Sequence, residues 1–272
     1  MPETADINAA RRTPHAAPEA PPAPTVYFAG DVHLDGAANA FPTFLDRLTV
    51  RSPARLVILG DLFEYWLESE RVARLHNGVL GRLRRLKAAG WRLDLVLGNR
   101  EFAAGRLLAI SSGCRLHWPR FDLTVGGRRV RVVHGDRLCH DPGYRALAAW
   151  MRAFWWRGWY PCVPVFVHDL FARWLRGRSR GIQAKRARTV GRPRVFIDRR
   201  RVQATGRGAD TVVAGHIHQS WRRTIGGVDL ILVGDWPNGR GQWVEGFADG
   251  RLERKAADFS ACPPGARPTS AA

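Results

Sequence analysis

The stretch Leu56-Val57-Ile58-Leu59-Gly60-Asp61-Leu62-Phe63-Glu64 decides how the rest of the chain is interpreted. Its four consecutive apolar residues, two of them β-branched, predict a short buried strand. The strand ends in Gly60-Asp61, which places a carboxylate at the carboxyl edge of a sheet, where α/β folds hold their sites. A single Gly-Asp pair is common in turns, so the inference depends on how many other strands end in the same way.

Four further hydrophobic runs end in Asp, Asn or His with glycine beside them. Their ends are Asp31-Val32-His33 after Gly30, Gly98-Asn99-Arg100, His134-Gly135-Asp136 and Gly215-His216-Ile217-His218. Glycine lets the backbone turn sharply and approach a bound group closely. The side chains offer carboxylate, amide and imidazole ligands but no thiolate, a set that suits divalent metals, and two ions better than one. The predicted metal ligands are Asp31, His33, Asp61, Asn99, His134, His216 and His218.

Each of these motifs is weak when it is considered alone. An Asp-x-His occurs by chance, Gly98-Asn99 is compatible with an ordinary turn, and His218 with a satisfied core histidine. The joint occurrence at five strand ends is what predicts a dinuclear metal site. The histidines outside this pattern are interpreted as core or surface residues: His76, His117, His140 and His168.

Composition limits the class of protein. The 272 residues, 45% of them hydrophobic, suffice for one large domain or two small ones, and no apolar run has the length of a transmembrane helix. The formal net charge of +19, nearly all from arginine, predicts acidic partners such as nucleic acid, anionic lipid or phosphorylated substrates, unless it reflects a compositional bias of the genome. The four cysteines form no Cys-x-x-Cys pair, which favours a reducing cytosol over a zinc site or a disulfide framework.

The sequence predicts a mixed α/β domain over residues 25–256. Helices are expected over 41–50, 71–89 and 101–111, and two hairpins around Gly126-Gly127 and Gly226-Gly227. Residues 1–24 are rich in alanine and proline and lack the apolar core of a signal peptide. These residues and 257–272 are expected to be disordered.

A helical insertion is expected over about 141–206. Its first part, residues 144–176, holds five of the eleven tryptophans, with arginines interleaved. The consecutive Phe154-Trp155-Trp156 cannot all face one core. We therefore expect part of this surface to contact another element, a ligand or a membrane, with an ordinarily packed helical subdomain as the alternative.

With these motifs the sequence resembles the calcineurin-like metallophosphoesterase superfamily, and within it the UDP-2,3-diacylglucosamine hydrolases of lipid A biosynthesis. The resemblance to the hydrolases extends from about Val26 to Val244. It rests on Gly60 to Glu64, Gly98-Asn99-Arg100, Leu138-Cys139 with Asp141 and Tyr144, Gly234-Asp235-Trp236, and the tryptophan-rich insertion. It implies a four-layer αββα sandwich of class α/β (α+β) with a helical lid insertion.

The resemblance also implies a reaction. UDP-2,3-diacylglucosamine is hydrolysed to UMP and 2,3-diacylglucosamine 1-phosphate, and a hydroxide activated by two divalent metals, usually Mn²⁺, attacks the α-phosphorus. By the family pattern one metal takes Asp31, His33, Asp61 and His218, and the other takes Asp61, Asn99, His134 and His216. Catalytic roles are implied for Asn99, Arg100 and His134. Substrate contacts are implied for Asn99, Arg100, Asp141, Ser179, Gln183, Arg186 and His216.

The implied partners are an acylated UDP-sugar and the anionic inner membrane, with no nucleic acid expected. The protein is accordingly expected in the cytoplasm, peripheral on the inner membrane, with its oligomeric state open. The insertion, over residues 144–188, is expected to hold the acyl chains.

The sequence departs from the family at several positions. Glu101 stands where the family usually has Asp, Glu68-Ser69-Glu70 replaces a Gly-Asp-Asp run, and Asp141 stands alone for an acidic pair. Ser179, Gln183 and Arg186 stand for Ser, Asn and Lys. One alternative is therefore a paralogous metallophosphoesterase acting on another nucleotide or phosphodiester. A nucleic-acid-binding module is the other, although a pure binder has no need of seven metal-type residues.

Overall fold

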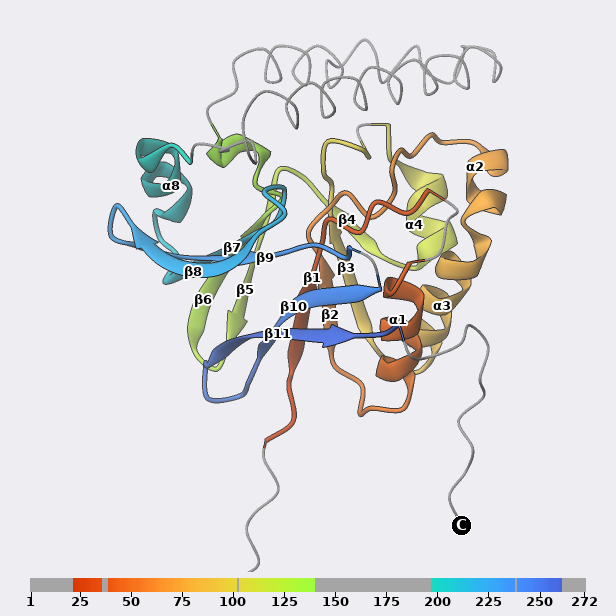
Figure 1. The fold of residues 1–272 in the computed structure, drawn as a ribbon, viewed down its shortest axis with the longest axis horizontal. Coiled ribbons are helices and arrows are strands. Elements are labelled where there is room, and N and C mark those ends of the chain that lie inside the picture. The colour runs from red at the N-terminus through yellow and green to blue at the C-terminus, as the bar shows by residue number, and fades with distance from the viewer. Residues whose placement is uncertain (1–21, 36–38, 102, 140–196, 238, 261–272) are drawn as a thin grey trace, which may run out of the picture.

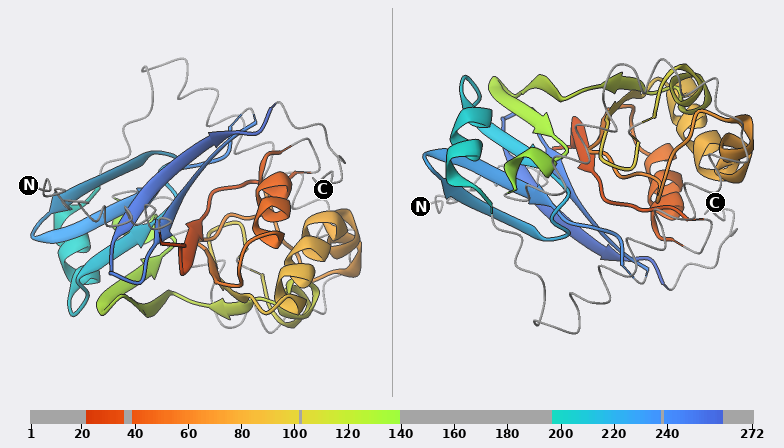
Figure 2. Two further views of the ribbon diagram at one scale, coloured as in Figure 1. Left: turned by 90° about the horizontal axis from the view of Figure 1, so that it is seen from below. Right: turned by 90° about the horizontal axis from the view of Figure 1, so that it is seen from above.

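Two β-sheets lie face to face with helices on their outer sides in the computed structural model of the chain (Figure 1, Figure 2). The structure describes residues 22–35, 39–101, 103–139, 197–237 and 239–260. The arrangement confirms the expected four-layer α/β sandwich. The expected helical lid lies outside the described residues, apart from its last ten positions.

The first sheet has six strands in the order β11-β10-β1-β2-β3-β4. The strands are β1 (Val26–Ala29), β2 (Arg55–Ile58), β3 (Arg92–Val96), β4 (Arg115–His117), β10 (Arg240–Gly246) and β11 (Leu252–Asp258). β1 to β4 are parallel neighbours, and β10 and β11 complete the sheet in antiparallel fashion. Because β1, β2 and β3 are parallel and adjacent, the loops that follow them meet at one edge of the sheet.

The second sheet has five strands in the order β5-β6-β7-β9-β8. The strands are β5 (Arg120–Val125), β6 (Arg128–Val133), β7 (Thr211–Ala214), β8 (Ser220–Ile225) and β9 (Val228–Val233). The two predicted hairpins are confirmed as β5–β6 and β8–β9, whose Gly-Gly turns have positive φ at both residues. β6 and β7 are parallel, so the loops after them also share one edge.

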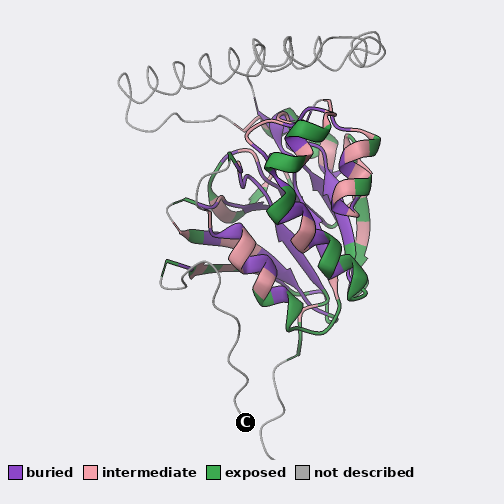
Figure 3. Ribbon diagram, turned by 90° about the vertical axis from the view of Figure 1, so that its right-hand side faces the viewer, coloured by how far each residue is buried: buried purple, intermediate pink, exposed green. Residues whose placement is uncertain are grey.

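Three hydrophobic clusters hold the layers together. The cluster between the sheets includes Phe28, Val57 and Val132, all fully buried or nearly so. A larger cluster lies beneath the helices of the first sheet, and a smaller one beneath the helix of the second. Figure 3 shows the helices over the first sheet exposing one face while the strands behind them are buried. The helices therefore cover sheet faces that would otherwise be exposed to water.

The helices begin and end for identifiable local reasons. They are α1 (Phe41–Thr49), α2 (Glu70–Leu75), α3 (Asn77–Ala88), α4 (Arg106–Ser112), the 3₁₀ turn η1 (Asp136–Leu138) and α8 (Arg199–Gly206). The single helix expected over 71–89 is wrong, because the chain breaks at His76, immediately before Asn77-Gly78. The helix expected from Glu101 begins only at Arg106, because Glu101 turns inward and Glu68 caps the later start.

The ends of the domain also differ from expectation. Cys139 forms an isolated antiparallel bridge with Ile197, so the chain leaves and re-enters the described domain at neighbouring points. α8 then packs its buried Val202 on the second sheet, so residues 197–206 belong to the domain rather than to the insertion. At the carboxyl end β11 continues to Asp258 and Phe259 is buried, past the expected boundary at 256. No helix among the described residues is both long and apolar enough to span a membrane.

Candidate metal centre

The seven predicted ligands meet where the parallel strands of both sheets end. Asp31, Asp61 and Asn99 follow β1, β2 and β3 of the first sheet, while His134 and His216 follow β6 and β7 of the second. The loops are fixed to each other by backbone hydrogen bonds, such as Asp31 N to Gly60 O at 3.1 Å and His33 N to Asp61 O at 2.9 Å. The fold therefore brings to one place residues that lie almost 190 positions apart in the sequence.

Five of these residues have an unusual backbone conformation. Asp31, His33, Asp61, His216 and His218 have φ values of 51°, 52°, 48°, 70° and 56°. They are the only non-glycine residues with positive φ in the described part of the chain. This left-handed region is disfavoured for residues with a Cβ, and such strain gathers at functional sites. The backbone conformation at these five residues thus directs their side chains toward one place, although it lowers the stability of the fold.

The first group of side chains comprises Asp31, His33 and His218. The Nε2 atoms of His33 and His218 lie 3.2 Å apart, and their rings stack with centroids 4.9 Å apart. Asp31 Oδ2 accepts a hydrogen bond from the His216 backbone N–H at 2.6 Å. Its other oxygen, Oδ1, is buried without a hydrogen-bond partner among the described residues. Two facing nitrogens and an unsatisfied carboxylate oxygen form a site for a cation.

The second group comprises Asp61, His134 and His216. His134 Nε2 and His216 Nδ1 lie 3.2 Å apart. The amide oxygen of Asn99 lies 2.8 Å from the first of these nitrogens and 3.1 Å from the second. Asn99 therefore adds a fourth ligand of the kind that borderline divalent metals accept.

Asp61 lies between the two groups. Its Oδ1 is 3.6 Å from His134 Nε2 in one group, and its Oδ2 is 3.9 Å from His33 Nε2 in the other. Oδ1 also accepts a hydrogen bond from the Arg100 backbone N–H at 3.0 Å. One carboxylate can thus contact ions on both sides, as the implied bridging role requires.

Neighbouring acceptors determine which nitrogen each histidine presents. His134 Nδ1 donates to the Leu59 carbonyl at 2.7 Å, and His218 Nδ1 to Asp235 Oδ2 at 3.1 Å. His33 Nδ1 lies 3.5 Å from Glu64 Oε2. In His134 and His218 the Nδ1 proton is engaged, so Nε2 keeps the lone pair needed for a metal, while Glu64 lies beside the Nδ1 of His33. His216 instead directs its Nδ1 toward the second group.

The electrostatics of the site fit a bound cation. Burial raises the pKa of Asp31 to about 6. Although burial also acts on Asp61, the nearby His134, His33 and Arg100 lower its pKa. Burial disfavours the charged form of His134, but the nearby Asp61 and Asp31 outweigh this effect and raise its pKa to about 9. Burial and the neighbouring His134 lower the pKa of His216 to about 4. The two buried carboxylates thus favour a positive charge nearby, and without a metal a protonated imidazole supplies it. Bound divalent metals would supply this charge and leave the histidines neutral.

Arg100 lies beside the bridging carboxylate. Its Nη1 donates to Glu64 Oε1 at 3.1 Å, and its Nε is 3.9 Å from Asp61 Oδ2. The side chain is 19% exposed, so the guanidinium is held in place yet reachable from solvent. This placement suits a donor to a phosphate oxygen bound at the two groups.

Glu101 supports the site in a way that the sequence did not predict. It is fully buried, and its carboxylate accepts the backbone N–H groups of Asp61, Phe63 and Gly98 at 2.9, 3.2 and 3.0 Å. It therefore ties the loop after β2 to the loop after β3. Burial and the nearby Asp61 raise its pKa to about 7. The only signal in the sequence was its position directly after Gly98-Asn99-Arg100.

The other predicted residues fall into two sets. His76 packs against the Phe63 ring at 4.5 Å, and His117 Nε2 lies 2.6 Å from Asp94 Oδ1, so both lie outside the site, as expected. The predicted substrate contacts Asp141, Ser179, Gln183 and Arg186, together with His140 and His168, lie outside the described residues. Glu64 and Asp235, which orient His33 and His218, were not predicted as site residues.

Comparison with known proteins agrees with this geometry. Residues 24–220 match the family described as calcineurin-like phosphoesterase. A protein of Ralstonia nicotianae named UDP-2,3-diacylglucosamine hydrolase is 32% identical over 225 residues, which are 78% of this chain and 83% of the relative. One of the same name from Chromohalobacter salexigens is 31% identical over 85% of this chain and 98% of its own.

Among solved structures, an archaeal phosphodiesterase aligns over 85% of this chain and 99% of its own. Its TM-score is 0.42 and its sequence identity 11%. A similarity of this size does not bear on the function.

Proposed function

We propose that this chain hydrolyses UDP-2,3-diacylglucosamine, because it belongs to the calcineurin-like phosphoesterase family and within it to the UDP-2,3-diacylglucosamine hydrolases. The products would be UMP and 2,3-diacylglucosamine 1-phosphate. The observation that carries the proposal is the meeting of two ligand groups on either side of Asp61. The choice of substrate is supported by the similarity to relatives named UDP-2,3-diacylglucosamine hydrolase, which extends over 83% and 98% of their own lengths.

Divalent metals are implied by the family and by the two groups of side chains. We place two ions there, most readily Mn²⁺, one held by Asp31, His33, Asp61 and His218 and the other by Asp61, Asn99, His134 and His216. The buried and unpartnered Asp31 Oδ1 supports this placement. When bound, two such ions activate water and neutralise phosphate oxygens.

The chain's own residues bind and orient the pyrophosphate. Arg100 donates charge-assisted hydrogen bonds to a phosphate oxygen, an interaction that strengthens as negative charge builds in the transition state. Glu64 accepts a hydrogen bond from Nη1 and so fixes the guanidinium beside Asp61. Because Asn99 Oδ1 faces the two imidazoles, its Nδ2 is the atom that remains to donate to the substrate.

Two departures from the family pattern have structural explanations. Glu101 accepts three backbone N–H groups, and Glu68 caps α4 through Gly105, Leu107 and Leu108. Both carboxylates are thus engaged by the protein itself. Neither departure therefore favours another substrate, although a paralogous phosphoesterase remains the alternative.

The setting we propose is the cytoplasmic face of the inner membrane, to which the protein would bind peripherally. The support is the net charge of +19 and the tryptophan-rich insertion, whose residues 144–188 would hold the acyl chains together with Asp141, Ser179, Gln183 and Arg186 at the polar head. A buried acyl chain gains about 0.8 kcal/mol per CH₂, so the chains could dominate binding.

The decisive experiment measures UMP release from UDP-2,3-diacylglucosamine by the full chain, with Mn²⁺ and with EDTA. We expect release that requires the metal and is lost in Asp61→Asn. His76→Leu serves as the control, because His76 lies outside the site. Cleavage of a small chromogenic phosphodiester without any UMP release would favour the paralogous phosphoesterase.

A second comparison tests the insertion. Replacing Trp155 and Trp156 with Ser should raise KM steeply for the acylated substrate and leave cleavage of the chromogenic phosphodiester nearly unchanged. Equal losses on both substrates would mean that these residues only support the fold.

A further inference from the structure

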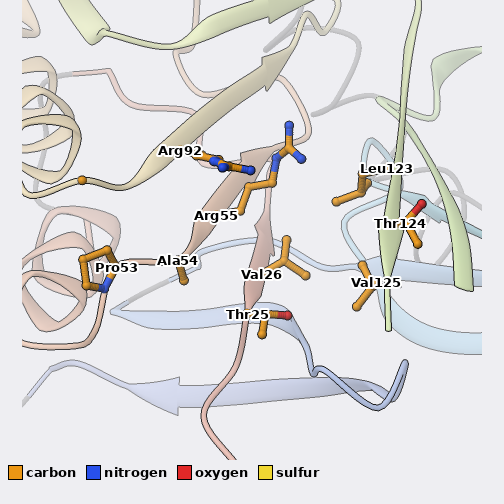
Figure 4. Close-up of a pocket in the computed structure, with 10 residues that line it drawn as sticks. Thr25, Val26, Pro53, Ala54, Arg55, Arg92, Leu123, Thr124 and Val125 are labelled. Atoms are coloured by element: carbon orange, nitrogen blue, oxygen red, sulfur yellow. The ribbon is translucent and has the colours of Figure 1, made fainter. Parts of the chain in front are cut away.

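A cleft between the two sheets lies at the end of the strands opposite the metal centre. Its walls are the first residues of β2 and β3 on one side and the last residues of β5 on the other, with Val26 at its floor (Figure 4). The cavity has a volume of about 410 Å³. That volume lies within the range of small-molecule sites in proteins.

Two arginines lie side by side on one wall of this cleft. Arg55 opens β2 and Arg92 opens β3, and the two are register partners in the parallel pair. Register partners project to the same face of a sheet, and Figure 4 shows both side chains on the β2–β3 side of the cleft. Like charges at directly paired positions repel each other. The wall therefore presents two positive charges, and an anion bound between the guanidinium groups would relieve their repulsion.

The protein supplies only part of that negative charge. Arg55 Nε donates to Asp94 Oδ2 at 2.8 Å, and its guanidinium lies 4.7 Å from the centre of the Phe121 ring. The other oxygen of Asp94 is occupied by His117 Nε2 at 2.6 Å. No acidic side chain lines the cleft among the residues that the structure describes. One carboxylate therefore serves Arg55 and His117, and the charge of Arg92 is not balanced within the cleft.

The remaining walls indicate what kind of anion would fit. Val26, Leu123, Val125 and Pro53 line the cleft with apolar groups. Guanidinium groups match the paired oxygens of phosphate, and each can donate two parallel hydrogen bonds. An apolar or aromatic body attached to the phosphate would cover the valine and leucine side chains.

We infer that this cleft binds a small phosphate monoester whose phosphate group lies between Arg55 and Arg92 and whose apolar body faces β5. The site is separate from the metal centre and does not depend on the proposed reaction. β2 and β3 reach the metal centre only at their other ends, where Asp61 and Asn99 follow them.

Phenylphosphonate is a suitable probe, because it carries the phosphate-like group and an aromatic body but no ester bond that the protein could hydrolyse. Its binding to the metal-loaded full chain is measured by calorimetry at physiological salt, for the native protein and for Arg92→Ala. The matched control is Arg115→Ala, which removes an exposed arginine from the start of the neighbouring strand β4, outside the cleft. Arg92→Gln, which removes the charge of this exposed residue and keeps most of its side chain, gives a second variant.

We expect a binding component that weakens at least about 10-fold in Arg92→Ala and in Arg92→Gln and is unchanged in Arg115→Ala. Inorganic phosphate should bind the same component more weakly, because it leaves the apolar wall uncovered. Equal weakening in Arg115→Ala would mean attraction to a basic surface and would overturn the proposal. Unchanged binding in both cleft variants would overturn it as well. If Arg92→Ala fails to fold, Arg92→Gln provides the test.

Discussion

Replacing Glu68 by Ala should destabilise the domain strongly, because this carboxylate accepts hydrogen bonds from four N–H groups. Oε1 accepts from Trp66 Nε1 at 2.9 Å and from the backbone of Gly105 and Leu108 at 2.8 and 3.2 Å. Oε2 accepts from the backbone of Leu107 at 2.8 Å. The residue thus caps the start of α4, a helix that lies well over thirty positions further along the chain.

The size of the effect follows from these contacts. Each hydrogen bond contributes about 0.5–1.5 kcal/mol net, so four of them give about 2–5 kcal/mol after partial rehydration of the freed groups. For a domain of this size each kcal/mol lowers Tm by about 2–4 °C, so Glu68→Ala should lower it by about 4–20 °C. Glu68→Gln keeps one acceptor oxygen and should lose roughly half as much.

Thermal and urea unfolding of the two variants measure this loss. The control is Glu70→Ala, two positions away, whose side chain is 80% exposed and pairs only with the 73% exposed Arg74 among the contacts seen. A surface pair of this kind contributes little, so the control should stay within about 0.5 kcal/mol of the native protein. If Glu68→Ala unfolds no earlier than Glu70→Ala, the reasoning about the cap is wrong.

Three further outcomes are expected. Asp61→Asn should abolish UMP release and lower the bound metal measured by elemental analysis; near-native activity with full metal content would contradict the bridging role. Arg100→Ala should lower kcat by roughly 10²–10³ with metal content unchanged, whereas loss of metal would show a structural role. Burial lowers the pKa of His76 to about 4, below its ordinary 6.5, so the unfolded chain binds this proton more readily as pH falls. Between pH 6.5 and 4 the free energy of unfolding should therefore fall by about 1–3 kcal/mol more in the native protein than in His76→Leu. If the free energy of unfolding depends on pH in the same way in both proteins, His76 is not a buried neutral imidazole.

The meeting of the seven candidate ligands could be predicted from the sequence because each part of the pattern is local. A hydrophobic run, a glycine and a ligand residue lie within a few positions of each other, and parallel strands bring such ends together without further information. The hairpins were predictable for the same reason, since Gly126-Gly127 and Gly226-Gly227 specify the turn within the segment itself.

What the sequence did not reveal depends on contacts between distant residues. The start of α4 is set by Glu68, and the inward turn of Glu101 by backbone N–H groups of the loop after β2. Arg55 and Arg92 lie beside each other only because β2 and β3 pair in this register, which the sequence does not specify. The break at His76 was missed because helix-forming residues continue on both sides of it.

The five left-handed residues of the centre offer a way to recognise loss of function in descendants of this gene. Glycine adopts positive φ without strain, so a mutation to glycine at Asp31, His33, Asp61, His216 or His218 would ease folding while it deletes a ligand. Selection for the reaction alone opposes that exchange. In a lineage that no longer needs the enzyme, glycine should be tolerated at these five positions more readily than at residues whose conformation is already relaxed.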